Sequence, residues 1–131
     1  MDGLEQEPFF RDHLFGLICN RLRRNFTIQR VYANGQTAHQ RGAAHVDDGD
    51  VTFLYYPNPT WQPSWAGGLH FVTSAHSRKA TAIVRYKPNR ALLFPAGLVH
   101  YAEAPSKHFA GLRVSLAYKL LRPVGADSGD A

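Results

Sequence analysis

The strongest constraint on the fold is the run of short apolar segments that follows Phe26. Segments rich in Val, Ile, Tyr, Phe and Thr alternate with Gly, Pro, Asn and Asp, which is typical of short strands separated by turns. The eight predicted strands cover residues 27–33, 43–47, 51–57, 68–73, 80–86, 91–95, 98–104 and 110–120. So many short strands predict a mainly β fold, as a sandwich, jelly roll or small barrel.

One amphipathic helix is predicted before these strands, over residues 7–24. Its apolar side chains recur at spacings of three and four residues. They are Phe10, Leu14, Leu17, Ile18 and Leu22. The length of 131 residues is that of one domain, which we place at residues 1–122. Residues 123–131 are small and polar, and we expect them to form a disordered tail.

The composition and the terminal sequence indicate a cellular location more clearly than a function. The apolar runs, such as residues 91–99, are far shorter than the ~20 residues of a membrane-spanning helix. The first residues lack the basic and apolar stretches of a signal peptide. Cys19 is the only cysteine, which excludes an internal disulfide and a Cys-rich zinc site. We therefore expect a cytoplasmic protein that is not bound to a membrane.

The net charge of +5 leaves two interpretations open. Four arginines lie close together in the sequence, at Arg21, Arg23, Arg24 and Arg30. They fit a solvated helix face, and they also fit an acidic partner such as nucleic acid. Charge alone does not distinguish the two.

Two histidine motifs suggest a metal site. His45-Val-Asp47 places an imidazole and a carboxylate at positions i and i+2, which lie on the same face of a strand. Pro95-Ala-Gly-Leu-Val-His100 places a second imidazole directly after a turn. Two His and one carboxylate can form the facial triad that suits non-haem Fe(II). A His-x-Asp pair alone is common, however, and a turn over residues 47–50 would also explain the acidic residues.

An alternating segment, Arg113-Val-Ser-Leu-Ala-Tyr-Lys119, adds a candidate anion site. Arg113 and Ser115 share one face of this predicted strand. A buried Arg needs an anion, and its fork of donors matches a carboxylate. If this face points into a barrel, a guanidinium and a hydroxyl lie together at the end of a pocket.

The order His-x-Asp, His, Arg-x-Ser resembles the Fe(II)/2-oxoglutarate-dependent dioxygenases, most closely their prolyl 4-hydroxylase-like branch. Residues 51–58, Trp61, Gly67-Gly68 and residues 88–94 also resemble the branch's Tyr-containing strand, Asn, Trp, paired glycines and the strand before the distal His. The resemblance covers roughly residues 30–120. It implies a double-stranded β-helix, which is a jelly-roll or cupin-like barrel, with one N-terminal α-helix.

The resemblance also implies a role for each motif residue. His45, Asp47 and His100 would bind Fe(II). Arg113 would pair with the distal carboxylate of 2-oxoglutarate, with Ser115 assisting.

Four further residues are implied or considered for the cosubstrate pocket. Tyr32, Leu54 and Tyr56 would line it or donate hydrogen bonds to the cosubstrate. His70 stands where the family often has a residue that faces the cosubstrate, so it would add a donor or else lie exposed on its strand. Residues 34–41 begin with the turn signal Asn-Gly and are predicted to form a flexible loop over the site.

The implied reaction is a hydroxylation. 2-Oxoglutarate and O2 would become succinate and CO2, while a C–H bond of a prolyl, other amino-acid or peptide-like substrate is hydroxylated, with ascorbate as a reductant. Asp47 favours hydroxylation, because halogenating relatives lack the carboxylate ligand. The expected partners are a small-molecule or peptide substrate. A homodimer is a further expected partner, since a barrel with one helix leaves apolar surface to cover.

Three other functions stay open. A nucleic-acid demethylase of the AlkB type uses the same triad, but it ends with two Arg six residues apart, where this chain has Arg113 and Lys119. A cupin-type metal or small-molecule binding module fits the turn before His100, but its first motif would be His-x-His with a later Glu. A catalytically inactive barrel is disfavoured by the complete set of ligands.

Overall fold

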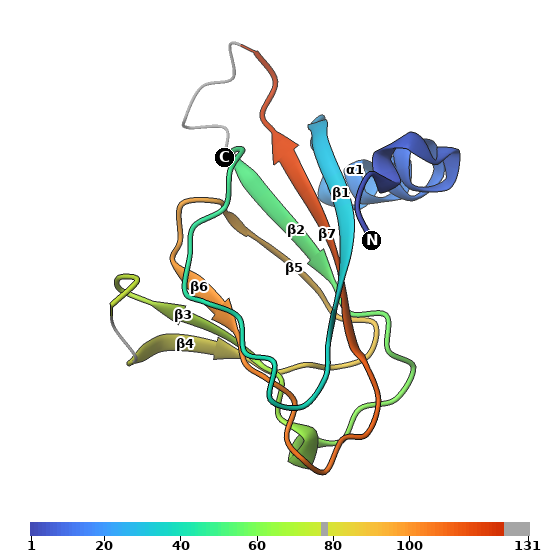
Figure 1. Ribbon diagram of the computed structural model, residues 1–131. Coiled ribbons are helices and arrows are strands. Elements are labelled where there is room, and N and C mark those ends of the chain that lie inside the picture. Colours follow the sequence, from blue (N-terminus) through green and yellow to red (C-terminus); the bar gives the residue numbers. More distant parts are fainter. Residues whose placement is uncertain (77–78, 125–131) are drawn as a thin grey trace.

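The computed structural model describes residues 1–76 and 79–124, and Figure 1 shows them as two facing sheets with a helical segment outside one of them. The helical elements are η1 (Leu4–Gln6), the π-helical η2 (Phe9–Leu14), α1 (Phe15–Leu22) and η3 (Pro63–Trp65). The strands are β1 (Thr27–Gln36), β2 (Val51–Tyr55), β3 (Leu69–Val72), β4 (Ala80–Val84), β5 (Ala91–Pro95), β6 (His100–Ala102) and β7 (Arg113–Leu121).

The strands pair only in antiparallel fashion. One sheet has the order β1-β7-β2-β5 and the other has the order β4-β3-β6. The predicted mainly β, double-stranded β-helix fold is therefore confirmed. No helix within the described ranges is long and apolar enough to cross a membrane. The domain boundary at residue 122 stays a prediction, and the tail lies outside the described residues from residue 125 onward.

Strand β7 lies between β1 and β2 in its sheet, and both of its faces are buried because the helical segment covers one and the second sheet lies opposite the other (Figure 1). Leu116, Tyr118 and Leu120 point toward the helices and form the hydrophobic core with Ile18 and Leu4. The other face of β7 is turned toward the second sheet, so successive residues of one strand serve the core and the interior of the barrel alternately.

The predicted helix over residues 7–24 is shorter in the structure. It starts at Phe9 with a π-helical segment and ends at Leu22. Arg23 takes a left-handed conformation, with φ of 55°, and terminates it. The apolar stripe packs on the sheet as predicted, since Ile18 is buried and Leu14 and Leu22 lie against the core.

Two segments differ from the sequence prediction. Residues 43–47 form no strand. Gly42 is bonded to Ala102 and His45 is paired with His100, so three residue steps on one side lie opposite two on the other. This mismatch interrupts the regular hydrogen-bond ladder. Only the isolated bridge between the two histidines remains. β1 also continues through the predicted turn as far as Gln36, because β7 supplies a partner for each of these residues.

The core between helix and sheet gives a direct test. We expect Leu120→Ala to lower the free energy of unfolding by about 2–5 kcal/mol, because the side chain is 0% exposed and its loss leaves a cavity. Leu93→Ala is the control, because Leu93 is 41% exposed on an edge strand, and its loss should be much smaller. Urea denaturation measures both values. Equal losses would contradict the core described above.

Candidate functional site

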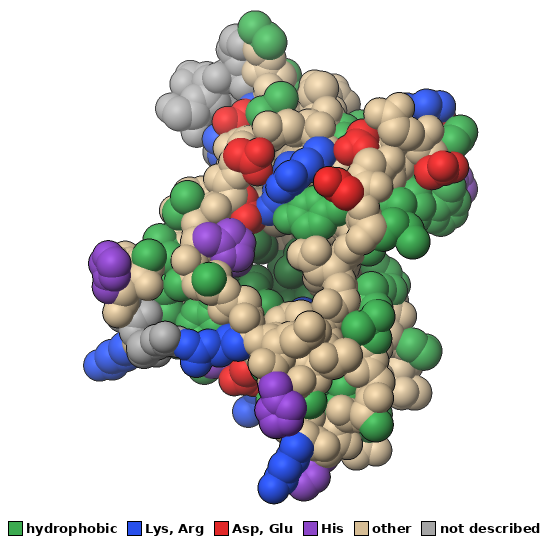
Figure 2. Space-filling model, in the orientation of Figure 1, with side chains coloured by type: hydrophobic (Ala, Val, Ile, Leu, Met, Phe, Trp, Pro, Cys, Tyr) green, Lys and Arg blue, Asp and Glu red, His purple; other side chains and the backbone are tan. Residues whose placement is uncertain are grey.

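A small cavity of about 70 Å³ lies between the two sheets, where Figure 2 shows the molecule hollowed with hydrophobic side chains inside. Its lining includes the predicted metal ligands, a Lys and a Thr beside them, the predicted anion-binding residues and two residues predicted for the cosubstrate pocket. In that order these are His45, Asp47 and His100, then Lys119 and Thr52, then Arg113 and Ser115, then Tyr32 and Leu54. Apolar side chains such as Leu69 and Phe94 complete the wall.

The three predicted metal ligands converge on one point. His45, Asp47 and His100 each offer a ligand atom, and these atoms lie within 4.8 Å of one another. Nε2 of His45 is 3.3 Å from Oδ1 of Asp47, and Nε2 of His100 is 3.4 Å from Oδ2. Two imidazole nitrogens and one carboxylate oxygen at this spacing form a donor set that suits non-haem Fe(II).

Backbone pairing fixes the two histidines relative to each other. The amide N–H of His45 donates to the carbonyl of His100 over 2.9 Å, and the reverse bond measures 3.0 Å. The amide of Asp47 donates to the carbonyl of Ala96, just beyond the end of β5. The broken ladder at residues 43–47 thus still anchors both ligand-bearing segments.

Both imidazoles are oriented by backbone carbonyls. Nδ1 of His45 is 2.7 Å from the carbonyl oxygen of Ala43, and Nδ1 of His100 is 2.7 Å from that of Leu98. A carbonyl only accepts, so each Nδ1 carries the proton. This leaves Nε2 of each ring as the atom directed at the cluster, which is the arrangement that metal-binding histidines require.

Asp47 is held as a carboxylate. Its side chain is only 4% exposed, and this burial would raise its pKa. Four hydrogen-bonding side chains outweigh the burial and lower the pKa far below its usual range. They are His100, His45, Lys119 and Thr52. In turn, the hydrogen bond to Asp47 is the main cause of a raised pKa at His45.

Arg113 is a buried cation whose hydrogen bonds, within the described part of the chain, go to neutral groups. It is 1% exposed, its Nε donates to the carbonyl of Gly67 over 2.8 Å, and its Nη1 donates to Oε1 of Gln36 over 2.8 Å. Burial lowers its pKa. Nη2 of Arg113 and the hydroxyl of Tyr56 are both buried, and neither has a hydrogen-bond partner among the described residues. A buried charge of this kind calls for an anion.

Aromatic rings and a glycine shape the surroundings of this guanidinium. Its Cζ lies 5.3 Å from the ring centre of Tyr56 and 5.1 Å from that of Tyr86. Gly67 has φ of +80°, and a Cβ there would lie 2.9 Å from Trp61 and 3.1 Å from Nε of Arg113. Glycine is therefore required for the close approach of this backbone to Arg113.

The remaining predicted residues divide between two places. Tyr32, Leu54 and Ser115 line the cavity, and Tyr56 lies beside Arg113. His70 does not line this cavity. It lines a separate groove of about 860 Å³, and its Nε2 is hydrogen-bonded to Oε2 of Glu103 over 3.0 Å.

Three residues of the site were not predicted as such. Lys119 and Thr52 contact Asp47, and Gln36 contacts Arg113. Strand alternation was a sufficient signal for the first two, because Lys119 shares a face with Arg113 and Thr52 shares one with Leu54. Gln36 belongs to residues 34–41, which the sequence predicts as a loop over the site, but no pattern distinguishes it from the other residues of that loop.

Several solved structures have a fold similar to that of this chain. A prolyl-4-hydroxylase from Pseudomonas putida aligns at a TM-score of 0.57 and 18% identity, covering 86% of this chain and 62% of that one. A 2OG-Fe(II) oxygenase family oxidoreductase from Burkholderia pseudomallei aligns at 0.56 and 17%, covering 79% and 48%. A prolyl hydroxylase from Trichoplax adhaerens, solved with a hypoxia inducible factor oxygen degradation domain peptide fragment, aligns at 0.55 and 20%, covering 91% and 59%.

These likenesses show the fold. The chain spans less than two thirds of the length of each of the three proteins. No protein-family model and no curated protein matches the sequence. The resemblance to prolyl 4-hydroxylase-like oxygenases drawn from the motifs is confirmed at the level of the fold and of a His-Asp-His cluster able to hold a metal.

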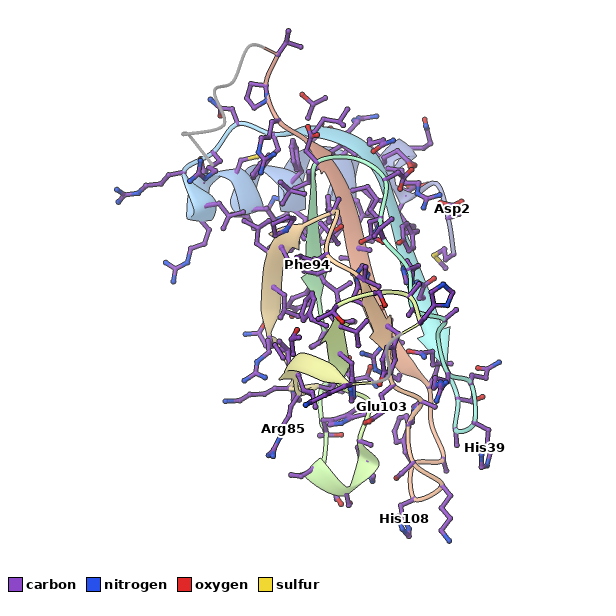
Figure 3. The ribbon with its side chains drawn as sticks, turned by 90° about the vertical axis from the view of Figure 1, so that its left-hand side faces the viewer. Asp2, His39, Arg85, Phe94, Glu103 and His108 are labelled. Carbon is purple, nitrogen blue, oxygen red and sulfur yellow. The ribbon has the colours of Figure 1, made fainter. Side chains whose placement is uncertain are left out.

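The cluster can be tested by metal binding. We expect His45→Ala to weaken Fe(II) binding at least about 100-fold, because one of three ligands is lost. Anaerobic titration calorimetry measures the affinity. His108→Ala is the control, since His108 is exposed and lies at the tip of a loop away from the sheets (Figure 3). Unchanged binding in His45→Ala would place the metal elsewhere.

Proposed function

We propose that this chain is an Fe(II)- and 2-oxoglutarate-dependent oxygenase that hydroxylates a C–H bond of a peptide or amino-acid-like substrate. The observation that carries the proposal is that one cavity is lined both by the His-Asp-His cluster and by a buried Arg113 without an anion. The chemistry of this lining would match a cosubstrate with two carboxylates, because one end could bind the metal and the other the guanidinium.

The residues present fit Fe(II). His45 and His100 each direct an Nε2 lone pair at the cluster, and Asp47 adds a single negative charge. These three residues would hold Fe(II) and would leave coordination positions for the cosubstrate and O2. When bound, Fe(II) and 2-oxoglutarate supply the oxidising chemistry, in which O2 and 2-oxoglutarate become succinate and CO2 and the substrate gains a hydroxyl group.

Arg113 would hold the distal carboxylate of 2-oxoglutarate. Its Nε and Nη1 are fixed by Gly67 and Gln36, so the guanidinium is oriented before the ligand arrives. The free Nη2 and the hydroxyl of Tyr56 are the two donors left for an anion. A charge-assisted hydrogen bond in this buried place is stronger than one at the surface.

The apolar wall would keep water from the reacting groups. Leu54, Leu69 and Phe94 line the same cavity as the His-Asp-His cluster. They contribute no chemistry of their own, but they lower the local dielectric and exclude side reactions with solvent. Ascorbate would serve as the external reductant of the iron.

A peptide or amino-acid-like substrate is favoured over nucleic acid. One similar protein, the Trichoplax adhaerens prolyl hydroxylase, was solved with a peptide fragment. In addition, Lys119, which stands where AlkB-type enzymes have their second Arg, is 2.6 Å from Asp47 and thus engaged at the metal cluster.

Cosubstrate binding is the first test of this function. We expect the Fe(II)-loaded protein to bind 2-oxoglutarate without O2 and to show a metal-to-ligand charge-transfer band. Arg113→Ala should raise the dissociation constant of 2-oxoglutarate about 10- to 100-fold, because a hydrogen-bonded charge pair contributes ~1.5–3 kcal/mol. Arg21→Ala, an exposed change on α1, is the control. A protein that binds Fe(II) but shows no band would overturn the proposal.

The substrate class is tested by stimulation of turnover. We expect a proline-containing peptide or free proline to increase succinate formation over the uncoupled rate, because bound substrate couples O2 use to hydroxylation. A methylated oligonucleotide is compared under the same conditions. Stimulation by the oligonucleotide alone would assign the chain to the nucleic-acid demethylases instead.

A further inference from the structure

Lys119 is a buried lysine that contacts a predicted metal ligand. Its side chain is 3% exposed, and its Nζ lies 2.6 Å from Oδ2 of Asp47. Thr52 stands directly opposite Lys119 in the ladder between β2 and β7, and its hydroxyl donates to the same Oδ2 over 2.7 Å. Sheet register therefore places two donors side by side against one carboxylate oxygen.

The two oxygens of Asp47 are consequently unequal. A carboxylate oxygen offers about two lone pairs, and Lys119 and Thr52 together engage those of Oδ2. Each oxygen also has one imidazole nitrogen near it, Nε2 of His100 at 3.4 Å from Oδ2 and Nε2 of His45 at 3.3 Å from Oδ1. Among the described residues, no hydroxyl or ammonium group donates to Oδ1. Oδ1 is thus the oxygen that stays free for a metal ion.

The backbone of Lys119 is held in place, so the difference between the two oxygens of Asp47 is a fixed property of the fold. β7 pairs with β1 on one side and β2 on the other, so the backbone of Lys119 is held from both sides. Within the described residues its ammonium pairs with the carboxylate of Asp47, and it lies 5.6 Å from the ring centre of Tyr32. The ammonium cannot turn to solvent without leaving a buried carboxylate.

We propose that Lys119 is a positioning residue of the metal centre, which together with Thr52 holds Oδ2 of Asp47 so that the metal is bound through Oδ1 alone. This inference rests on the proposed function. A carboxylate bound through one oxygen occupies one coordination position, whereas one bound through both occupies two. Lys119 thereby keeps a position open, and its positive charge also weakens the binding of a divalent cation.

Mn(II) is a suitable probe, because it accepts the same ligands and its bound waters can be counted by water-proton relaxation. In Lys119→Met the freed Oδ2 can join the coordination and the repelling charge is gone. We expect the affinity for Mn(II) to rise about tenfold or more. We also expect the number of exchanging waters to fall by about one, as the second oxygen replaces a water. Free-Mn(II) electron paramagnetic resonance gives the affinity.

Three further variants separate positioning from a general structural role. Lys119→Arg keeps a charged donor and should restore the wild-type water number. Thr52→Val removes the other donor to Oδ2, so it should also lower the number of bound waters. This variant tests the proposal if Lys119→Met does not fold. Lys107→Met changes an exposed lysine and should leave both values unchanged.

The outcomes are distinct. An unchanged water number in Lys119→Met and Thr52→Val, or a lower affinity in Lys119→Met, would overturn the role of Lys119 while leaving the metal site intact. If the unaltered protein binds no Mn(II), the metal site of the proposed function fails as well.

Discussion

The alternation of side chains along β7 is the constraint on which both the core and the site depend. Tyr118 and Leu120 face the helices and are fully buried, whereas Arg113 and Lys119 face the second sheet. β7 pairs with β1 from Arg113 to Leu121 and with β2 from Leu116 to Leu120, so its two faces cannot shift independently of each other. The hydrophobic core thus fixes where the two buried cations lie, and a strand that packs well on one side presents its polar residues accurately on the other.

The two buried cations have opposite electrostatic situations. Lys119 is paired with a carboxylate, and the pair is almost free of solvent. In the described part of the chain, Arg113 donates its hydrogen bonds to the neutral groups of Gln36 and Gly67, and its Nη2 has no hydrogen-bond partner there. Gly67 is itself held by Glu103, whose Oε1 accepts its amide N–H over 3.0 Å while Oε2 bonds His70. Figure 3 shows Glu103 near the lower end of the sheets. The unsatisfied positive charge at Arg113 is what an acidic ligand would neutralise.

The fold class and the ligand cluster could be predicted because both follow from local patterns. Strand periodicity and turn residues located the seven observed strands, and the i, i+2 spacing of His45 and Asp47 survived even though their segment forms no regular strand. The features that the sequence did not predict depend on distant partners. The Asn-Gly signal after Ala33 was overridden by pairing with β7, and His70 bonds Glu103, which is 33 residues away. Single-sequence patterns do not contain such contacts.

The two-sided character of β7 also bears on how the chain selects one register. A slip of one residue along β1 and β2 would move Arg113 and Lys119 into the interface with the helices and place Tyr118 and Leu120 in the polar cavity. Both charges would then lose their hydrogen bonds in an apolar layer, at a cost that no gain in packing offsets. The residues that equip the interior for chemistry therefore also discriminate against misaligned sheets during folding.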